Sequence, residues 1–406
     1  MAAINVYGTG ANSTQGANTV VHYYDKAGVK AANEMNVYAQ WADRKEMPLN
    51  MGKTFKISKF LHIYDREQSA TDFATKGYLS TRNITDVSSG LTATNGTGAK
   101  LLEGSGETNK RSIKKITIET AFSSYGEMLD YTDEVTMFSE DIIQVRYREE
   151  LGRLANRRSE DLIQLDMLGT TNVMFAGTAT TNATIGVGVA ANGSTDAFFK
   201  VNHDLIRKAA KRLVRNRAEK NTDMVVGSTK IDTKTINKAY YAIVGPEVKY
   251  DLENLTRGAS YETEFVYVPA YKYASSENLA EGEVGAMGDV RFIESESAVV
   301  YTGQGAVPPQ NYVGSLSYSG ATDITSATGT ARGFFDVFPI LFPTKGSFAT
   351  VGLKGYNKIQ FNSQSPEQID RTNPFGTNGF FSYRFWYAGI ILQPERLLKV
   401  MVAASV

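Results

Sequence analysis

The longest stretch of regular hydrophobic spacing in this chain covers residues 139–169. Its apolar residues recur at intervals of three and four, the period of one helix face. Ser139 is a good N-cap and Gly169 a good C-terminal stop, so the pattern predicts a helix of ~30 residues, about 45 Å long. The apolar stripe consists of Ile143, Tyr147, Leu151, Leu154, Leu162, Leu165 and Leu168.

Three further segments have helical spacing. Residues 27–44 carry apolar side chains on one stripe, and residues 203–220 follow Asn202, a favourable N-cap. Residues 233–244 are predicted to form a third helix that ends at the Gly245–Pro246 pair.

Two strand-like runs, residues 55–64 and 113–121, alternate in hydrophobicity and flank a long polar tract. That tract, residues 80–112, is rich in Thr, Ser, Gly and Asn and lacks the apolar surface to order itself alone. The pattern predicts two strands joined by a long protruding hairpin arm.

The remaining sequence is mostly strand-like, with loose polar segments between the strands. In residues 380–387 both faces carry aromatic side chains, which favours a strand covered on both sides. The other predicted strands are residues 224–226, 265–268, 290–293, 298–301, 334–338, 348–353, 380–392 and 397–402, and the loose segments are 1–26, 176–197 and 303–332.

The composition fits a globular protein and excludes several classes of function. The 406 residues suffice for roughly two to three domains, and 43 basic residues balance 43 acidic ones. A generic DNA-binding domain would show a basic excess. There is no cysteine and there are three isolated histidines, His22, His62 and His203, so thiolate chemistry is excluded. We expect no signal peptide and no membrane helix.

The search for catalytic motifs yields no site. Residues 52–54 read Gly-Lys-Thr, but Met47 stands where a phosphate-binding loop needs glycine. Glu294 and Glu296 share one strand face, a pattern typical of a solvated surface. The Ser-x-x-Lys match at residues 112–115 lacks its companion motifs. We therefore predict a protein that is not an enzyme, with no catalytic, cofactor-binding or metal-binding residues and no cofactor.

Residues 203–220 carry the only local charge bias. A solvated helix face is the simplest interpretation, and contact with nucleic-acid phosphates or with an acidic neighbouring subunit are the functional ones. The basic residues are Arg207, Lys208, Lys211, Arg212, Arg215, Arg217 and Lys220, against Asp204 and Glu219.

The order of these elements, together with three stretches of sequence, resembles the major capsid protein of tailed bacteriophages, especially the coat proteins of schitovirus-type short-tailed phages. The first stretch is residues 282–295, the second is the helix 139–169 preceded by residues 126–133, and the third is residues 380–402 with Pro-Glu-Arg at 394–396.

The resemblance implies an α+β fold with four parts. Residues 1–54 would form the N-terminal arm and 55–121 the extended E-loop. Residues 122–197 and 380–406 would form the peripheral P-domain with its spine helix at 139–169. Residues 198–379 would form the mixed α/β A-domain.

It also implies a structural subunit that assembles through hexamers and pentamers into an icosahedral shell around double-stranded DNA. The expected partners are other copies of the chain, a separate scaffolding protein, a portal protein, packaged DNA through non-specific contacts, and a decoration protein. The expected location is the virion capsid, assembled in the bacterial cytoplasm. Some relatives crosslink a lysine to an asparagine, for which Lys76, Lys100 and Lys110 are the candidates. The alternatives are another phage structural or surface protein and, less favoured, a β-rich hydrolase.

Overall fold

The computed structural model describes residues 37–60, 115–138, 143–221, 238–255, 268–269, 282–319, 333–356, 359–369 and 373–406. All of them belong to the compact unit Met35–Val406. The predicted polar tract 80–112, the segment 1–26, the strand 224–226, His22, His62 and the three candidate crosslinking lysines lie outside the described residues.

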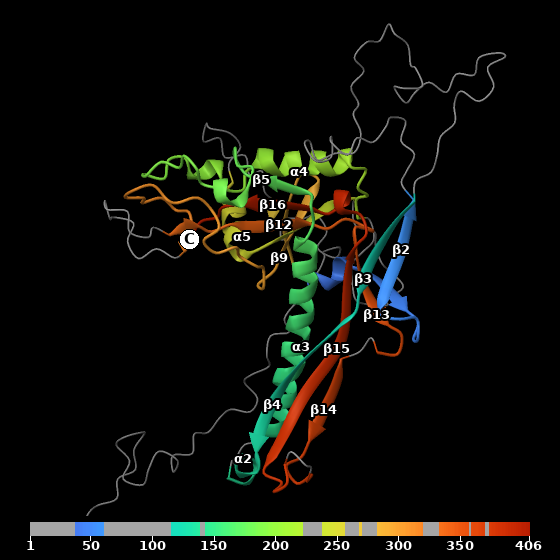
Figure 1. Ribbon diagram of the computed structural model, residues 1–406. Coiled ribbons are helices and arrows are strands. Elements are labelled where there is room, and N and C mark those ends of the chain that lie inside the picture. The colour runs from blue at the N-terminus through green and yellow to red at the C-terminus, as the bar shows by residue number, and fades with distance from the viewer. Residues whose placement is uncertain are drawn as a thin grey trace, which may run out of the picture. The chain divides into compact units, whose positions relative to one another are not determined.

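A seven-stranded mixed sheet forms the centre of the described chain (Figure 1). Its two central strands, β12 and β6, have every residue buried. The β5–β16 and β6–β9 pairs are parallel and the other pairs antiparallel. The strand order is β5 (Val173–Phe175), β16 (Leu398–Val402), β12 (Phe338–Phe342), β6 (Tyr240–Val244), β9 (Val290–Glu294), β8 (Glu283–Met287) and β7 (Val268–Pro269).

Helices α4 (His203–Arg215) and α5 (Pro246–Glu253) pack on one face of this sheet. Their apolar side chains share a buried cluster with Phe292 of β9 and Phe342 of β12. The opposite face carries a cluster that includes Tyr241 and Leu341 together with residues of the long helix. We call the sheet with α4 and α5 the sheet region.

The second part, which we call the ribbon, extends away from the sheet region along α3 (Ile143–Leu168) (Figure 1). Its central strand is β15 (Asn378–Ile391), flanked by β4 (Ser123–Thr132) and β14 (Gln360–Gln364). Helix α2 (Asp133–Phe138) follows β4. Beyond the ribbon, the C-terminal end of β15 pairs with β13 (Phe348–Leu353), which pairs in parallel with β1 (Asp43–Met47).

Strands β1, β13, β15, β14 and β4 form the second sheet of the chain, and a two-stranded hairpin extends from it. Strands β2 (Thr54–Phe60) and β3 (Lys115–Ala121) are antiparallel over seven residue pairs. This confirms the predicted pairing of the two strand-like runs, while the connection between them lies outside the described residues.

Two predicted helices are wrong where the structure describes them. Residues 37–44 of the segment 27–44 form a short 3-10 turn, η3 (Ala39–Trp41), and the start of β1, because their aromatic side chains are buried against α3 and β6. Residues 240–244 of the segment 233–244 form β6, buried on both faces, so no polar alternation marks it as a strand. Pro246 begins α5 instead of ending a helix.

Several boundaries also differ from prediction. Helix α4 ends at Arg215 because Arg217 adopts a φ of +54°. Residues 298–301 make only an isolated bridge, between Tyr301 and Val337. The predicted strand 334–338 is split between β11 (Phe334–Phe335), which pairs with β10 (Tyr318–Ser319), and β12.

The predicted loose segment 176–197 is packed rather than loose. It contains η5 (Asn182–Thr184) and most of η6 (Asp196–Phe198), and Ile185 and Val189 join a buried cluster with Phe335. Gly186 has a φ of +91° and lies so close to the Phe335 ring that a side chain there would collide. Gly186 is therefore a packing position.

Candidate assembly surfaces

The inner face of the ribbon is an aromatic layer beneath α3. Leu151 and Ala155 of the helix are fully buried against alternate residues of β15. Tyr131 of β4 stacks on Phe381 with ring centroids 5.2 Å apart. The remaining aromatic residues of this layer are Tyr125, Tyr147, Tyr383, Phe385 and Tyr387. This packing makes α3 and the strands one stiff unit.

Two polar contacts connect α3 to the strands at the margin of that layer. Arg158 Nη2 lies 2.7 Å from Glu127 Oε1 of β4, and this carboxylate raises the pKa of Arg158. The Tyr387 hydroxyl donates to Asp166 Oδ2 at 2.8 Å. Desolvation raises the pKa of the Asp166 carboxyl, and burial beside that carboxylate raises the pKa of Tyr387. Both contacts fix the rotation of α3 on the ribbon.

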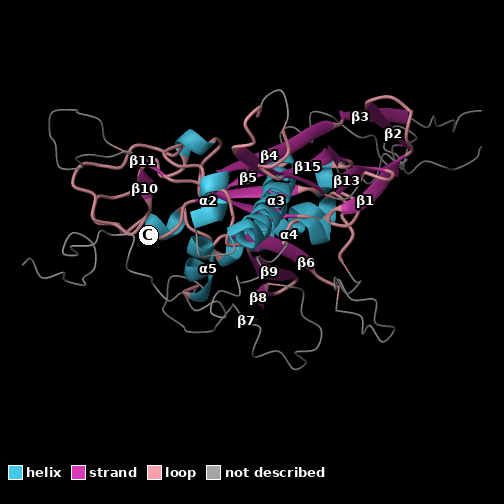
Figure 2. Ribbon diagram, turned by 90° about the horizontal axis from the view of Figure 1, so that it is seen from below, coloured by secondary structure: helices cyan, strands magenta, loops and turns pink. Residues whose placement is uncertain are grey.

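The first described residues, 37–41, form a clasp against α3, the helix labelled at the centre of Figure 2. The backbone N–H of Tyr38 donates to the buried Glu160 carboxylate at 2.8 Å, and that of Ala39 donates at 3.3 Å. The Tyr38 hydroxyl and the Gln164 amide are hydrogen-bonded at 2.8 Å. Val37 and Trp41 are buried beside them. The clasp anchors the chain where the N-terminal segment joins the ribbon.

The far end of the ribbon presents apolar side chains outward. Phe375 is 88% exposed, Met137 72% and Ile369 71%. The loop that carries Phe375 is ordered by Asn373, whose amide donates to Asn378 O at 2.7 Å and accepts from Thr377 N at 2.9 Å. Helix α2 is tied to the same loop, because Asp133 N donates to Thr377 O at 2.9 Å. We call Met137, Ile369 and Phe375 the apolar tip.

The hairpin is fixed to the end of β15 and to the chain that follows it. Lys59 Nζ donates to Leu392 O at 3.0 Å and lies 3.5 Å from Glu395 Oε1. The Thr120 hydroxyl donates to Gly389 O at 2.9 Å. Glu395 belongs to η9 (Pro394–Arg396), part of the C-terminal stretch that carried the family resemblance. The hairpin therefore starts from a defined position.

The residues considered for catalysis are dispersed. Glu294 pairs with Lys249 at 2.6 Å, Glu296 is exposed, and His203 begins α4. Gly52 turns into β2 with a φ of +88°. Among the described residues, no group of three or more His, Asp or Glu side chains is placed to hold a metal ion. Within the same residues, no helix is long and apolar enough to cross a membrane.

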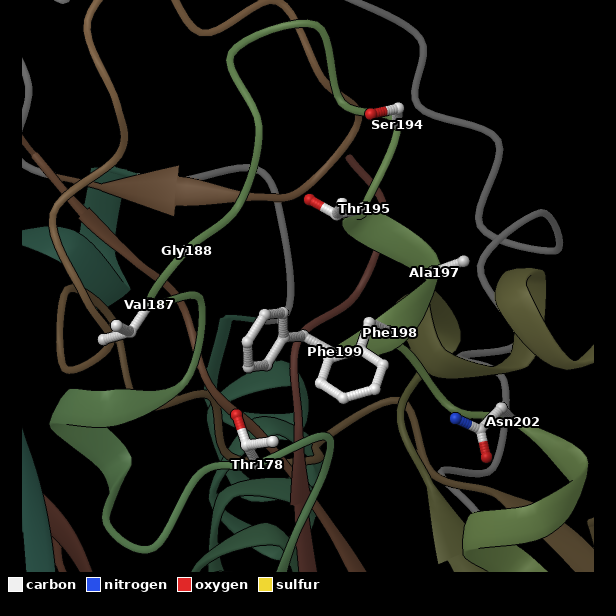
Figure 3. Close-up of a pocket in the computed structure, with 9 residues that line it drawn as sticks. All are labelled: Thr178, Val187, Gly188, Ser194, Thr195, Ala197, Phe198, Phe199 and Asn202. Carbon is white, nitrogen blue, oxygen red and sulfur yellow. The ribbon is translucent and has the colours of Figure 1, made fainter.

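A shallow hollow of about 530 Å³ lies beside η6 (Figure 3). The rings of Phe198 and Phe199 meet edge to face in it, 5.4 Å apart. Its lining contains no ionisable side chain, so it has no general acid, general base or metal ligand. The lining residues are Thr178, Val187, Gly188, Ser194, Thr195, Ala197, Phe198, Phe199 and Asn202.

Known proteins are similar to this chain over nearly its whole length. No family model matches. The chain is 26% identical over 406 residues to the "Major capsid protein" of Pseudomonas phage KPP21, covering 97% of this chain and 95% of the relative.

Among solved structures, the capsid of Ralstonia phage GP4 has a TM-score of 0.57 at 11% identity and covers 98% of this chain and 99% of its own. The capsid of Helicobacter pylori bacteriophage KHP30 has a TM-score of 0.52 at 9% identity, with coverages of 98% and 99%. These similarities confirm the predicted resemblance and the predicted fold class. The chain has the α+β fold of tailed-phage capsid proteins and resembles a phage major capsid protein over almost its whole length.

Proposed function

We propose that this chain is a structural major capsid protein that assembles with copies of itself, as hexamers and pentamers, into the icosahedral shell of a tailed bacteriophage. The observation that carries the proposal is the match to a phage major capsid protein over 97% of the chain, together with the capsid fold. The role is mechanical, so no bond-making step is assigned to any residue.

The exposed side chains support self-assembly as the physical task. A stiff ribbon that ends in three strongly exposed apolar residues gains free energy when a neighbouring subunit covers them. Individual contacts of this kind are weak, and a closed shell multiplies them. A second copy of the chain therefore stabilises the ribbon without any change in the sheet region.

The finer assignments follow from the same proposal. Residues 1–54 act as the N-terminal arm, 55–121 as the E-loop, 122–197 with 380–406 as the P-domain, and 198–379 as the A-domain. The polar tract 80–112 lies across an adjacent subunit. A separate scaffolding protein, a portal and a decoration protein assist assembly in the bacterial cytoplasm, and the finished shell encloses double-stranded DNA in the virion.

Expression of the chain with the scaffolding protein of its phage, followed by negative-stain microscopy, tests the proposal. We expect closed shells from the full chain, and only folded, unassembled subunits after deletion of residues 80–112. Replacement of Ile369 and Phe375 by Asp is expected to have the same effect, while Val313→Asp, at a side chain 79% exposed in the loop before β10, retains assembly. Failure of the full chain to form particles would contradict the proposal.

A further inference from the structure

Helix α4 concentrates positive charge in a chain that is neutral overall. Between His203 and Arg217 there are six basic residues and one acidic residue, whereas the whole chain has 43 of each sign. The acidic residue, Asp204, is paired with Lys208 at 2.6 Å. The exposed basic residues are Arg207, Lys208, Lys211, Arg215 and Arg217.

The packing of α4 leaves this row of exposed basic residues outside the core. Leu205, Ile206, Ala209 and Leu213 are buried on the sheet, and the Asn202 side chain caps the helix by accepting from Leu205 N at 2.8 Å. Arg212 belongs to the packing instead, because its guanidinium donates to Val173 O at 2.9 Å and its burial lowers its pKa. The other basic residues therefore lie outside the core, on a helix that packs on one face of the sheet (Figure 1).

The spacing of the row suits a phosphate backbone. Arg207, Lys211 and Arg215 follow one another at intervals of four residues, so they lie about 6 Å apart along the axis and span about 12 Å, the width of the DNA major groove. Guanidinium groups bind phosphate oxygens in a bidentate manner. No aromatic side chain lies between them to stack on bases, so the surface fits backbone contacts that are independent of sequence.

A protein partner fits this surface less well. Protein interfaces are depleted in lysine and enriched in aromatic side chains at their centres. The only large hydrophobic side chain that α4 exposes is Val214. The exposed face of α4 thus offers a neighbouring subunit cations but little apolar surface to bury.

We propose that the exposed basic face of α4 binds the phosphates of packaged double-stranded DNA, and that α4 therefore faces the interior of the shell. The inference rests on the proposed function. Each subunit contributes a few screened contacts, and the many copies in one shell make the sum effective.

The test compares three proteins as unassembled subunits and as shells. The variant carries Arg207→Gln, Lys211→Gln and Arg215→Gln. The matched control carries Arg44→Gln, Lys53→Gln and Lys354→Gln, three exposed cations on the second sheet and at the root of the hairpin. Binding of subunits to a random-sequence duplex is measured by fluorescence anisotropy at several salt concentrations, and shell formation by microscopy.

Loss of three phosphate contacts should lower the slope of log K against log salt by about 2.7, so that the affinity change between about 50 and 200 mM salt shrinks about 40-fold. The control should bind like the wild type, and all three proteins should form shells. Unchanged DNA binding by the variant overturns the inference. Unchanged DNA binding with loss of shells points instead to an acidic neighbouring subunit. If wild-type subunits form no shells, the proposed function fails, whatever the DNA result.

Discussion

The sheet region and the ribbon bury their strands in different ways. In the sheet region, β12 and β6 have every residue buried, with apolar clusters on both faces. In the ribbon, β15 buries mainly alternate residues beneath α3, and β14 is almost entirely exposed. The sheet region thus supplies its own core, whereas α3 covers only one face of the ribbon.

This difference separates folding from assembly. Burial on two faces stabilises the sheet region within one subunit. The ribbon keeps apolar side chains in water along its strands and at its tip, including Met128 of β4 and Phe361 of β14, which are 56% and 55% exposed. Those side chains contribute little to the stability of the isolated subunit. They contribute to the stability of the assembly when neighbouring subunits bury them.

The largest expected effect comes from a phenylalanine in each region. Phe342→Ala in β12, at a side chain with 0% exposure, should lower the free energy of unfolding by about 3–5 kcal/mol. Phe361→Ala in β14 should lower it by only about 1 kcal/mol, because 55% of that side chain is already exposed. Urea unfolding followed by circular dichroism measures both free energies of unfolding. Equal losses in the two variants would contradict the difference in burial between the sheet region and the ribbon.

The clasp provides the next largest effect. Glu160→Ala leaves the Tyr38 and Ala39 N–H groups without their acceptor, so we expect a loss of about 1–3 kcal/mol. Trp386→Phe makes Trp41 the only tryptophan, and its emission should shift to the red as the clasp opens. Glu150→Ala removes an exposed pair with Arg153 at 2.7 Å and serves as the control. Similar emission changes in both variants would rule out a specific role for Glu160.

The Arg158–Glu127 pair should contribute less. A double-mutant cycle with Arg158→Ala and Glu127→Ala should give a small favourable coupling energy, below the loss expected for Glu160→Ala, because both side chains are partly exposed. The coupling should weaken as salt is added. A value independent of salt would show that the two variants act through the packing of α3 instead of through charge.

The sequence predicted the ribbon better than the sheet region. The helical period of α3 is visible because the helix buries one face and exposes the other. The strand over 380–392 was also predicted, but the expectation that residues 380–387 are covered on both sides is wrong, because β15 buries only alternate residues there. In β6 all five residues are buried, so the run Tyr-Tyr-Ala-Ile-Val carries no period and reads equally well as helix. The error over 233–244 follows directly from that two-sided burial.

The assembly surfaces were less accessible to sequence reasoning. Ile369 and Phe375 stand in a loop where hydrophobicity alone does not reveal exposure, because Asn373 and its hydrogen bonds decide which way the loop faces. The clasp was also missed, since the aromatic spacing of Tyr38 and Trp41 imitates a helix. The cluster of basic residues on α4 was visible in the sequence, because a charge cluster can be seen without a fold, but the packing of Arg212 against Val173 O could not be predicted from it.

The smallest expected effect is a pH dependence at the Asp166–Tyr387 contact. Desolvation raises the pKa of Asp166 above its ordinary value of 3.8, so between that value and the higher folded one the native state holds a proton that the unfolded chain has released. Stability therefore falls as the pH rises through this window. Asp166→Asn keeps an oxygen that can accept from the Tyr387 hydroxyl but does not titrate. Wild type should lose stability relative to this variant above pH 3.8 by less than about 1 kcal/mol, since Asp166 is partly in water. Denaturant unfolding at a series of pH values measures the difference in the free energy of unfolding. If the wild type became more stable relative to the variant as the pH rises, the Tyr387 hydrogen bond would outweigh desolvation.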